Sequence, residues 1–207
     1  DKNYYKYLDG FKKGTSLVIH DPTEIKGKST QPVLDNMPKF NILTIRETVN
    51  SLLKKGRPEP YGFKPTQNRF IVHPFFPYKI SNVKKTKAIA ISRIDFDKHT
   101  EVILEANKML EKRGKRPVDI YGAKNDLYVY HHLKNKLNLD LDRYYKGTFK
   151  KEFTMVDSLL KDAKFVVDMS AIKGDGGGSQ YTFLEAIYQD CALVLNSKWV
   201  EGVKTPF

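Results

Sequence analysis

The chain has 207 residues, 40 % of them hydrophobic and 12 % aromatic, which is enough to bury one large core or two small ones. Thirty-six Lys and Arg against 24 Asp and Glu give a formal charge of +12, which favours anionic partners, although a lysine-rich surface also serves solubility alone. The single cysteine, Cys191, excludes a disulfide within the chain and indicates a reducing, cytoplasmic setting, and no apolar run approaches the roughly 20 residues of a membrane span.

The first 78 residues predict part of an α/β unit. Apolar runs predict strands at 16–20, 40–44 and 69–74. We expect helices at 4–13 and 46–55, and loops containing Gly and Pro at 24–38 and 57–68. The second helix ends before Gly56 with two lysines in its last turn, as helix C-termini prefer. These elements make only part of an α/β layer and the chain begins without Met, so we expect a partial domain.

A polar, basic stretch at 79–87 predicts a linker, and strands alternate regularly with helices over 88–207. The expected strands are 88–92, 117–121, 143–146, 164–169 and 192–196. The expected helices are 100–113, 127–137, 151–161 and 181–187, with Ile103, Leu104, Met109 and Leu110 of the first facing inward. Helices of this length between strands indicate a parallel sheet covered on both faces, whose ligands bind beyond the carboxyl ends of the strands.

A glycine-rich loop stands between the fourth of these strands and the last helix. It contains Asp175, Gly176, Gly177, Gly178 and Ser179. Free N–H groups at a helix N-terminus attract anions, so the loop predicts a phosphate site, although an ordinary surface turn explains the same residues. Glu185 lies about one and a half turns into the helix, within reach of a ligand over the loop.

Two cations follow the first strand of the 88–207 region at its carboxyl end. Arg93 would grip a phosphate as a planar fork and Lys98 as a point charge. The alternative is surface pairing with Asp95 and Asp97. Gly122 ends the next strand and predicts a close backbone approach at the same edge of the sheet.

The order of these motifs, SRIDFDKH, YGAKND, KGTF, DMS and GGGSQYTFLEA, resembles the carboxyl-terminal half of a GT-B glycosyltransferase of the large retaining family 4, the glycosyl transferases group 1. VIHD at 18–21 and the segments 41–49 and 71–76 are similar to the acceptor domain of that family. The resemblance implies an α/β fold of two Rossmann-like units. They are a partial acceptor-side unit at 1–78 and a donor-binding unit at 88–207 whose end is incomplete, and a linker at 79–87 joins them.

The resemblance also implies roles for individual residues. Arg93 and Lys98 match the basic pair that the family uses on the donor diphosphate. Gly147 and Phe149 match the turn that faces the nucleotide base, and His99 stands where the family has glycine.

In the glycine-rich region, Glu185 matches the second acid of an E-x7-E motif that holds the donor ribose. Gly177 occupies the place of the first acid, and Asp175 is its nearest substitute. His20, at the end of a strand in the first unit, is a candidate catalytic residue, with a structural role as the alternative.

The implied reaction transfers a glucose-like hexose from a nucleotide-diphosphate sugar to an acceptor hydroxyl, with retention. A UDP-sugar such as UDP-glucose is the favoured donor, and no metal or other cofactor is required. Phage GT-B enzymes that glucosylate hydroxymethylcytosine in DNA have basic clefts, so hydroxymethylated DNA is an expected acceptor and a viral protein of the host cytoplasm an expected setting. The expected acceptor unit contains a basic and aromatic cluster: Lys54, Lys55, Arg57, Tyr61 and Phe63. Its Lys and Arg side chains suit phosphate contacts, but a solvated basic face explains them as well.

Two other classes remain open. A non-catalytic domain that binds nucleotide sugars or nucleic acid would also suit the missing first acid and the partial first unit. A dinucleotide-dependent dehydrogenase is disfavoured, because no strand is followed by G-x-G-x-x-G and the dense glycine cluster stands late in the chain.

Overall fold

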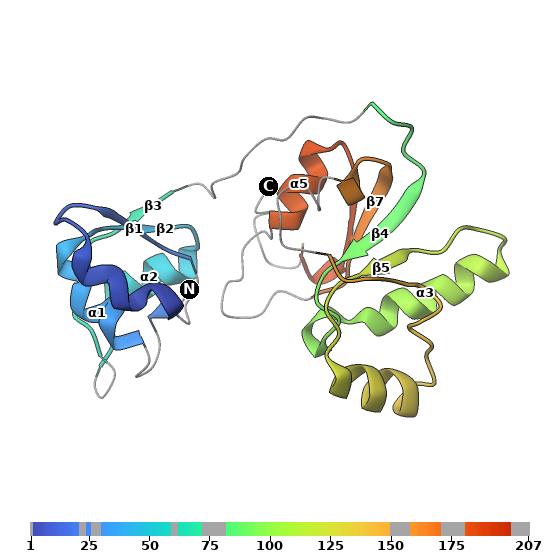
Figure 1. The fold of residues 1–207 in the computed structure, drawn as a ribbon, viewed down its shortest axis with the longest axis horizontal. Coiled ribbons are helices and arrows are strands. Elements are labelled where there is room, and N and C mark those ends of the chain that lie inside the picture. The colour runs from blue at the N-terminus through green and yellow to red at the C-terminus, as the bar shows by residue number, and fades with distance from the viewer. Residues whose placement is uncertain are drawn as a thin grey trace. The chain divides into compact units, whose positions relative to one another are not determined.

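A computed structural model describes residues 2–20, 24–25, 30–58, 62–71, 82–149, 158–170 and 181–199. These residues form two compact units, the first from residues 2–71 and the second from 82–170 and 181–199 (Figure 1). Each unit is an α/β layer around a parallel sheet, as the sequence predicts. In the described part of the chain, no helix is long and apolar enough to cross a membrane.

The first unit has a three-stranded parallel sheet in the order β1-β2-β3. Its strands are β1 (Ser16–Ile19), β2 (Asn41–Thr44) and β3 (Arg69–Phe70). Its helices are α1 (Gln31–Asn36) and α2 (Glu47–Lys55), with 3-10 segments at Lys2–Gly10 and Met37–Lys39. Ile19 and Ile42 of the sheet share a buried core with Val49 and Leu53 of α2. This core holds the helices on one side of the sheet (Figure 1).

Helix α1 corrects the prediction of a loop over residues 24–38. Pro32 stands in the first turn of the helix, where its missing N–H costs no hydrogen bond. Val33, Leu34 and Met37 are buried in the core of the unit. Burial therefore produces a helix in a segment too short and too rich in proline to show helical periodicity.

The second unit has a five-stranded sheet in the order β6-β5-β4-β7-β8, with all neighbours parallel. The strands are β4 (Lys87–Ile91), β5 (Asp119–Tyr121), β6 (Tyr145–Gly147), β7 (Ala163–Asp168) and β8 (Ala192–Leu195). The helices are α3 (Thr100–Lys112), a π-helix at Tyr128–Lys136 and α5 (Tyr181–Tyr188), with 3-10 turns at Phe96–Lys98 and Ser197–Trp199. The five predicted strands are thus confirmed to within a few residues.

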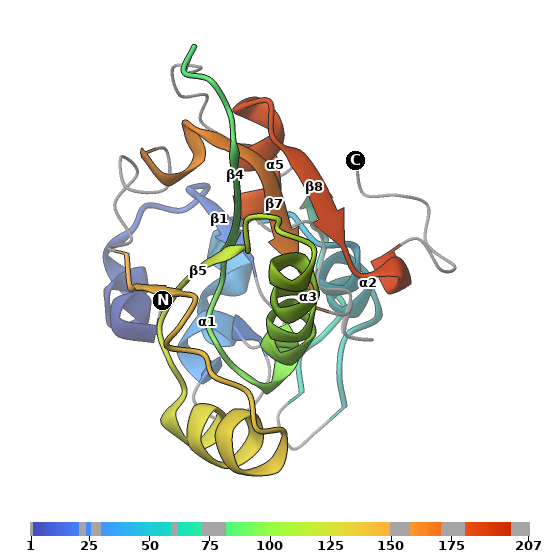
Figure 2. The same ribbon diagram turned by 90° about the vertical axis from the view of Figure 1, so that its right-hand side faces the viewer.

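Both faces of this sheet are covered, as expected for parallel strands. Successive residues of β4 point to opposite faces: Ala90 joins the core beneath α3 and the π-helix, whereas Ile89 joins the core that includes Ala186 of α5. Figures 1 and 2 show α3 and α5 on opposite sides of the sheet.

Helix α3 packs against the sheet through a few residues on one of its faces. Ile103, Leu104 and Asn107 are buried, and Leu110 packs against the same core. Met109, predicted to face inward, is 55 % exposed. At about 100° per residue it lies roughly opposite Asn107 and Leu104, so the prediction for Met109 was wrong.

The helix predicted at 127–137 is present, but its hydrogen bonds follow the wider i→i+5 pattern over Tyr128–Lys136. Of the helix predicted at 151–161, residues 158–160 are helical, and most of the remainder lies outside the described residues.

Asn107 joins α3 to the strand that follows it. Its side chain donates to the carbonyl oxygen of Val118 at 2.9 Å and accepts from the N–H of Val118 at 2.7 Å, fully buried. Asn107→Ala removes the hydrogen-bond partners of both the N–H and the carbonyl oxygen of Val118, which are buried. We therefore expect it to lower the free energy of unfolding by about 2–4 kcal/mol. Urea denaturation measures this change. Lys108→Ala, on the exposed side of the same helix, should cost less than about 0.5 kcal/mol, and equal losses in the two variants would contradict the assignment.

Candidate functional site

The order in which strands are added to the sheet reverses between β4 and β7, while all strands stay parallel. After β4 the chain adds β5 and β6 on one side of β4, and it then adds β7 and β8 on the other side. Ligands of open α/β sheets bind beyond the carboxyl ends of the strands at such a reversal. Here the segments that leave this edge are residues 92–99 after β4 and 169–170 after β7.

Residues 92–94 are fixed to the neighbouring loop by backbone hydrogen bonds. The N–H of Ser92 donates to Tyr121, and the N–H of Ile94 donates to Ala123, at 3.2 and 2.9 Å. The backbone N–H of Asn125 donates to the carbonyl oxygen of Ile94 at 3.0 Å. These bonds extend the parallel pairing past the ends of both strands. The loop that carries Arg93 therefore starts from a defined position.

Gly122 allows this close pairing. Its φ is +147°, and a Cβ at this position would lie 1.7 Å from the carbonyl oxygen of Ser92. The close backbone approach predicted for Gly122 is thus present, and the atoms that approach belong to Ser92.

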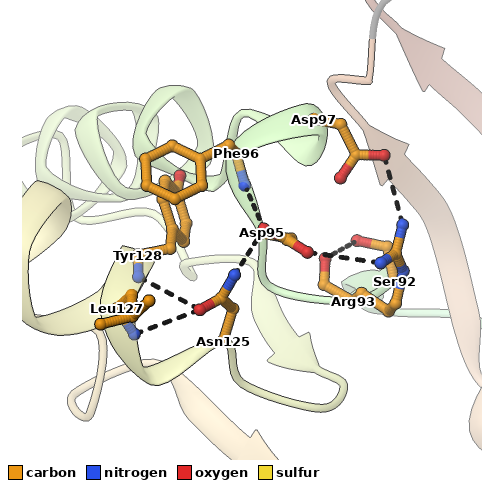
Figure 3. A network of polar contacts seen from close by, with 8 residues as sticks. All are labelled: Ser92, Arg93, Asp95, Phe96, Asp97, Asn125, Leu127 and Tyr128. Carbon is orange, nitrogen blue, oxygen red and sulfur yellow. Dashed lines mark hydrogen bonds and ion pairs between the residues drawn. The ribbon is translucent and has the colours of Figure 1, made fainter.

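Asp95 and Asn125 join the two loops through their side chains (Figure 3). Asp95 Oδ1 accepts from the Phe96 N–H at 2.8 Å and from Asn125 Nδ2 at 2.9 Å. Asn125 Oδ1 accepts from the N–H groups of Leu127 and Tyr128, and so caps the start of the π-helix. One carboxylate and one amide thereby position two helical segments.

Arg93 forms the surface pairs that the sequence offered as the alternative to ligand binding. Nη1 lies 3.3 Å from Asp95 Oδ2 and Nη2 lies 3.3 Å from Asp97 Oδ2 (Figure 3). The Arg93 side chain is 64 % exposed. Both arms of the guanidinium fork thus face carboxylates, on the solvent side of the loop.

Lys98 and His99 end the same loop. Lys98 is half-buried and closes the 3-10 turn through its N–H, which donates to the carbonyl oxygen of Asp95 at 3.0 Å. His99 has φ +48° and ψ +46°, a left-handed conformation that glycine adopts without steric cost. This backbone geometry explains why glycine suits the position in the resembled family.

A partly buried network follows His99 at the start of α3. His99 Nδ1 lies 3.0 Å from Glu101 Oε1, and the buried Tyr128 hydroxyl donates to Glu101 Oε2. Burial acts to raise the pKa of Glu101, but the hydrogen bonds from Tyr128 and His99 outweigh it and hold that pKa below its usual value. Burial and the bond to Glu101 raise the pKa of Tyr128. Glu101 is therefore an ionised anchor for the loop.

Gly147 is the last residue of β6, and Phe149 follows the strand. Gly147 has φ +108°, and its carbonyl oxygen accepts from the Gly122 N–H at 3.0 Å. Among the described residues, no atom beyond its chain neighbours lies within 4 Å of the position of a Cβ. Phe149 is half-buried against the core around Ile89 and Val166. Because β4, β5 and β6 are adjacent and parallel, Arg93, Gly122 and Gly147 lie at one edge of the sheet.

The end of β7 forms a buried turn on the other side of the reversal. Asp168 Oδ1 accepts from both the N–H and the hydroxyl of Ser170. Asn196, after β8, donates to the carbonyl oxygen of Met169 at 3.1 Å. These contacts fix the segment that leads from β7 toward the glycine-rich loop.

The structure describes only part of the site predicted from the glycine-rich loop and the helix after it. Asp175, Gly176, Gly177, Gly178 and Ser179 lie outside the described residues. Glu185 is half-buried in the middle of α5, whose predicted helix is confirmed, and its role as a ribose ligand stays a prediction.

His20 follows β1 at its carboxyl end in the first unit. Its N–H donates to Glu24 Oε2 at 2.8 Å, and its side chain is half-buried. A catalytic role for His20 stays a prediction. Among the described residues, no group of three His, Cys, Asp or Glu side chains is arranged to hold a metal ion.

Some residues that shape the site were missed from the sequence. Asn125 stands just before a helix in the pattern typical of an N-cap, so local reasoning could have found it. The contact between Glu101 and Tyr128 joins residues 27 positions apart, and no local pattern marks it.

Comparison with known proteins finds likeness at the level of fold. No protein-family model matches the sequence, and a search of curated proteins finds no significant match. Solved structures do match. S. aureus TarM, as a point mutant in complex with fondaparinux, alpha-GlcNAc-glycerol and UDP, is 20 % identical, with a TM-score of 0.57 over 88 % of this chain and 36 % of its own.

Two further structures match nearly the whole chain. The pneumococcal O-GlcNAc transferase GtfA, in complex with UDP and GlcNAc, has a TM-score of 0.61 and 12 % identity over 100 % of this chain and 45 % of its own. An alpha-glucosyltransferase in complex with UDP-glucose and DNA containing an abasic site has a TM-score of 0.61 and 15 % identity. The match covers 98 % of this chain and 58 % of the alpha-glucosyltransferase chain. This chain thus spans 36 % to 58 % of the length of these GT-B glycosyltransferases and shares their fold.

The contact of Gly122 with Ser92 gives a test of the loop geometry. Gly122→Ala should lower the free energy of unfolding by about 3 kcal/mol or more, because the new methyl group overlaps backbone atoms that are themselves hydrogen-bonded. Gly147→Ala is the matched control: it also has positive φ but open space, and should cost only the backbone strain of about 1–2 kcal/mol. Denaturant unfolding of both variants measures the difference, and similar costs would contradict the close packing at Ser92.

Proposed function

We propose that this protein is a glycosyltransferase that moves a hexose from a nucleotide-diphosphate sugar to an acceptor hydroxyl. The observation that carries the proposal is the pair of cations, Arg93 and Lys98, on an anchored loop beside the β4–β7 reversal of a GT-B-like sheet. In this assignment residues 88–207 bind the donor, 79–87 link the units and 1–78 contribute to the acceptor side.

Arg93 and Lys98 would bind the donor diphosphate. The two ion pairs of Arg93 are exposed and each is worth at most about 1 kcal/mol, so a diphosphate can replace the carboxylates at low cost. A guanidinium fork binds two phosphate oxygens at once, which gives it an advantage over a lysine of equal charge.

Other donor contacts follow from the resemblance. Gly147 and Phe149 would face the base, and Glu185 the ribose. Gly122 and the loop residues Asp175, Gly176, Gly177, Gly178 and Ser179 complete the proposed donor set. A UDP-sugar is the proposed donor, supported by the UDP bound to the similar TarM and GtfA structures and the UDP-glucose bound to the alpha-glucosyltransferase.

In the proposed reaction the bond between the anomeric carbon and the diphosphate oxygen breaks, the acceptor oxygen bonds to that carbon, and the proton of the acceptor hydroxyl passes to the leaving diphosphate. Negative charge grows on the leaving diphosphate. Arg93 and Lys98 would stabilise this charge from fixed positions, without a metal cofactor. Retention at the anomeric carbon and a role for His20 are part of the proposal by resemblance.

The proposed acceptor is anionic, with hydroxymethylated DNA as the leading candidate. The formal charge of +12 supports this choice, as does the DNA bound to the similar alpha-glucosyltransferase. The buried single cysteine, Cys191, supports a reducing setting, and we propose the cytoplasm, of the host if the protein is viral.

A non-catalytic nucleotide-sugar-binding domain is the second candidate. The observation that favours it is Gly177, which stands where the resembled family has the first acid of its E-x7-E motif. Activity separates the two functions, because an active transferase also releases sugar from its donor slowly into water.

The test is nucleoside diphosphate release from a panel of nucleotide sugars, with and without DNA containing hydroxymethylcytosine. Arg93→Ala and Lys98→Ala should each lower the release rate by about 10- to 1000-fold, because each removes a charge that stabilises the leaving group. Circular dichroism and thermal unfolding should change little, since the Arg93 pairs are exposed.

Lys112→Ala and Arg113→Ala are the matched controls. Both are exposed cations at the carboxyl end of α3, and the right-handed crossover brings this end to the amino edge of the sheet. They should keep the activity of the unaltered protein. Donor binding without release from any sugar would favour the non-catalytic domain, and full activity in the Arg93 and Lys98 variants would refute these roles.

A further inference from the structure

The turn after α2, in the first unit, is fixed tightly to the end of its helix. Arg57 and Phe63 exchange two backbone hydrogen bonds, at 2.9 and 3.0 Å, and Thr66 donates its N–H to Leu53 of α2 at 2.9 Å. Gly56 ends the helix with φ +74°, and a Cβ there would lie 2.8 Å from the Phe63 carbonyl oxygen. The base of the turn is therefore a preformed structure.

A depression lies on this turn, lined by residues 55–58 and 62–65. Lys55, Arg57 and Lys64 contribute three positive charges, and no carboxylate is among these lining residues. Phe63 adds a half-buried aromatic side chain. The depression therefore has the charge and the mixed polar and aromatic lining that suit a phosphate ester.

Arg57 carries a second, independent signal. Its Nη1 atom is buried and has no hydrogen-bond partner among the residues that the structure describes. A buried guanidinium nitrogen without an acceptor is costly, so the described residues leave part of the hydrogen-bonding capacity of Arg57 unused. In the second unit, Arg116 and Arg143 pair with Asp119 and Glu111, which shows how this chain satisfies arginines elsewhere.

Helix stabilisation does not account for the whole cluster. Lys55, like Lys54, stands in the last turn of α2, where a cation offsets the helix dipole. Arg57 and Lys64 lie beyond the helix, on the two sides of the turn, and gain nothing from that dipole.

We propose that this depression binds phosphate groups of a nucleic-acid backbone. Arg57 takes one phosphate through its fork, while the exposed Lys55 and Lys64 contact the phosphates next to it. The contact is independent of base sequence, because it involves the backbone alone. It rests on the proposed function in one respect: it makes the bound nucleic acid the acceptor of the transferase.

The test is the salt dependence of binding to a labelled duplex DNA of about 20 base pairs, measured by fluorescence anisotropy from about 50 to 200 mM salt. The double variant Arg57→Gln, Lys64→Gln should bind about 10-fold or more weakly at the low-salt end. The slope of log K against log salt should fall by about 2, since two phosphate contacts are lost. The turn should survive, because Arg57 closes it through backbone atoms.

Lys112→Gln with Lys115→Gln removes the same charge from exposed positions of the second unit and is the matched control. It should keep the slope of the unaltered protein. Equal losses in both double variants, no effect of the Arg57 and Lys64 changes, or no salt-dependent binding by the unaltered protein would each overturn the site. Displacement of the DNA by a few millimolar inorganic phosphate, with no change in the salt slope of the variant, would also overturn it and indicate a site for free phosphate.

Donor hydrolysis in the absence of DNA separates this proposal from the transferase itself. The Arg57 and Lys64 variant should release nucleoside diphosphate at the rate of the unaltered protein, because neither residue belongs to the proposed donor set and the proposed diphosphate ligands, Arg93 and Lys98, lie in the second unit. A protein that binds DNA through Arg57 and Lys64 but hydrolyses no donor would leave the nucleic-acid site standing while the transferase fails.

Discussion

The carbonyl oxygen of Ser92 occupies the space that any side chain at position 122 would need, and the geometry of the loops after β4 and β5 depends on this one contact. Because residue 122 is glycine, the loops after β4 and β5 can continue their parallel pairing beyond the sheet. That pairing brings Asn125 to Asp95, and Asp95 fixes the turn next to Arg93. A steric constraint on the backbone at Gly122 thus helps to set the position of Arg93 on the neighbouring loop.

The two units treat their positive charge differently. In the second unit the arginines at positions 93, 116 and 143 meet carboxylates, so their charge is compensated locally. In the turn after α2, Arg57 lines a depression whose described lining residues, 55–58 and 62–65, include no carboxylate, and its buried Nη1 has no partner in the part of the chain that the structure describes. An exposed ion pair yields easily to a diphosphate that comes and goes, whereas an uncompensated cluster suits an extended polyanion.

Much of the fold follows from local pattern, and the errors have physical causes. The strands of the second unit and α3, α5 and the glycine end of α2 were predicted because buried parallel strands are apolar runs and helix ends carry distinctive residues. Helix α1 was missed because burial of Val33 and Leu34 stabilises it. Met109 was wrongly assigned to the core because it precedes Leu110, which does pack there, and a rotation of about 100° per residue turns Met109 toward solvent. The i→i+5 hydrogen bonds of Tyr128–Lys136 have no sequence signature that distinguishes them from those of an α-helix.

The sequence by itself determined two parallel α/β layers, the carboxyl edge at which Arg93, Lys98, Gly122 and Gly147 gather, and a strong positive charge, because periodicity, chirality and composition are local properties. Only the tertiary structure decided that β7 lies beside β4, since strand order depends on which faces pack together. It also decided between the two readings of Arg93 in this state: the fork faces Asp95 and Asp97, because the turn that Asp95 caps brings both carboxylates back to it.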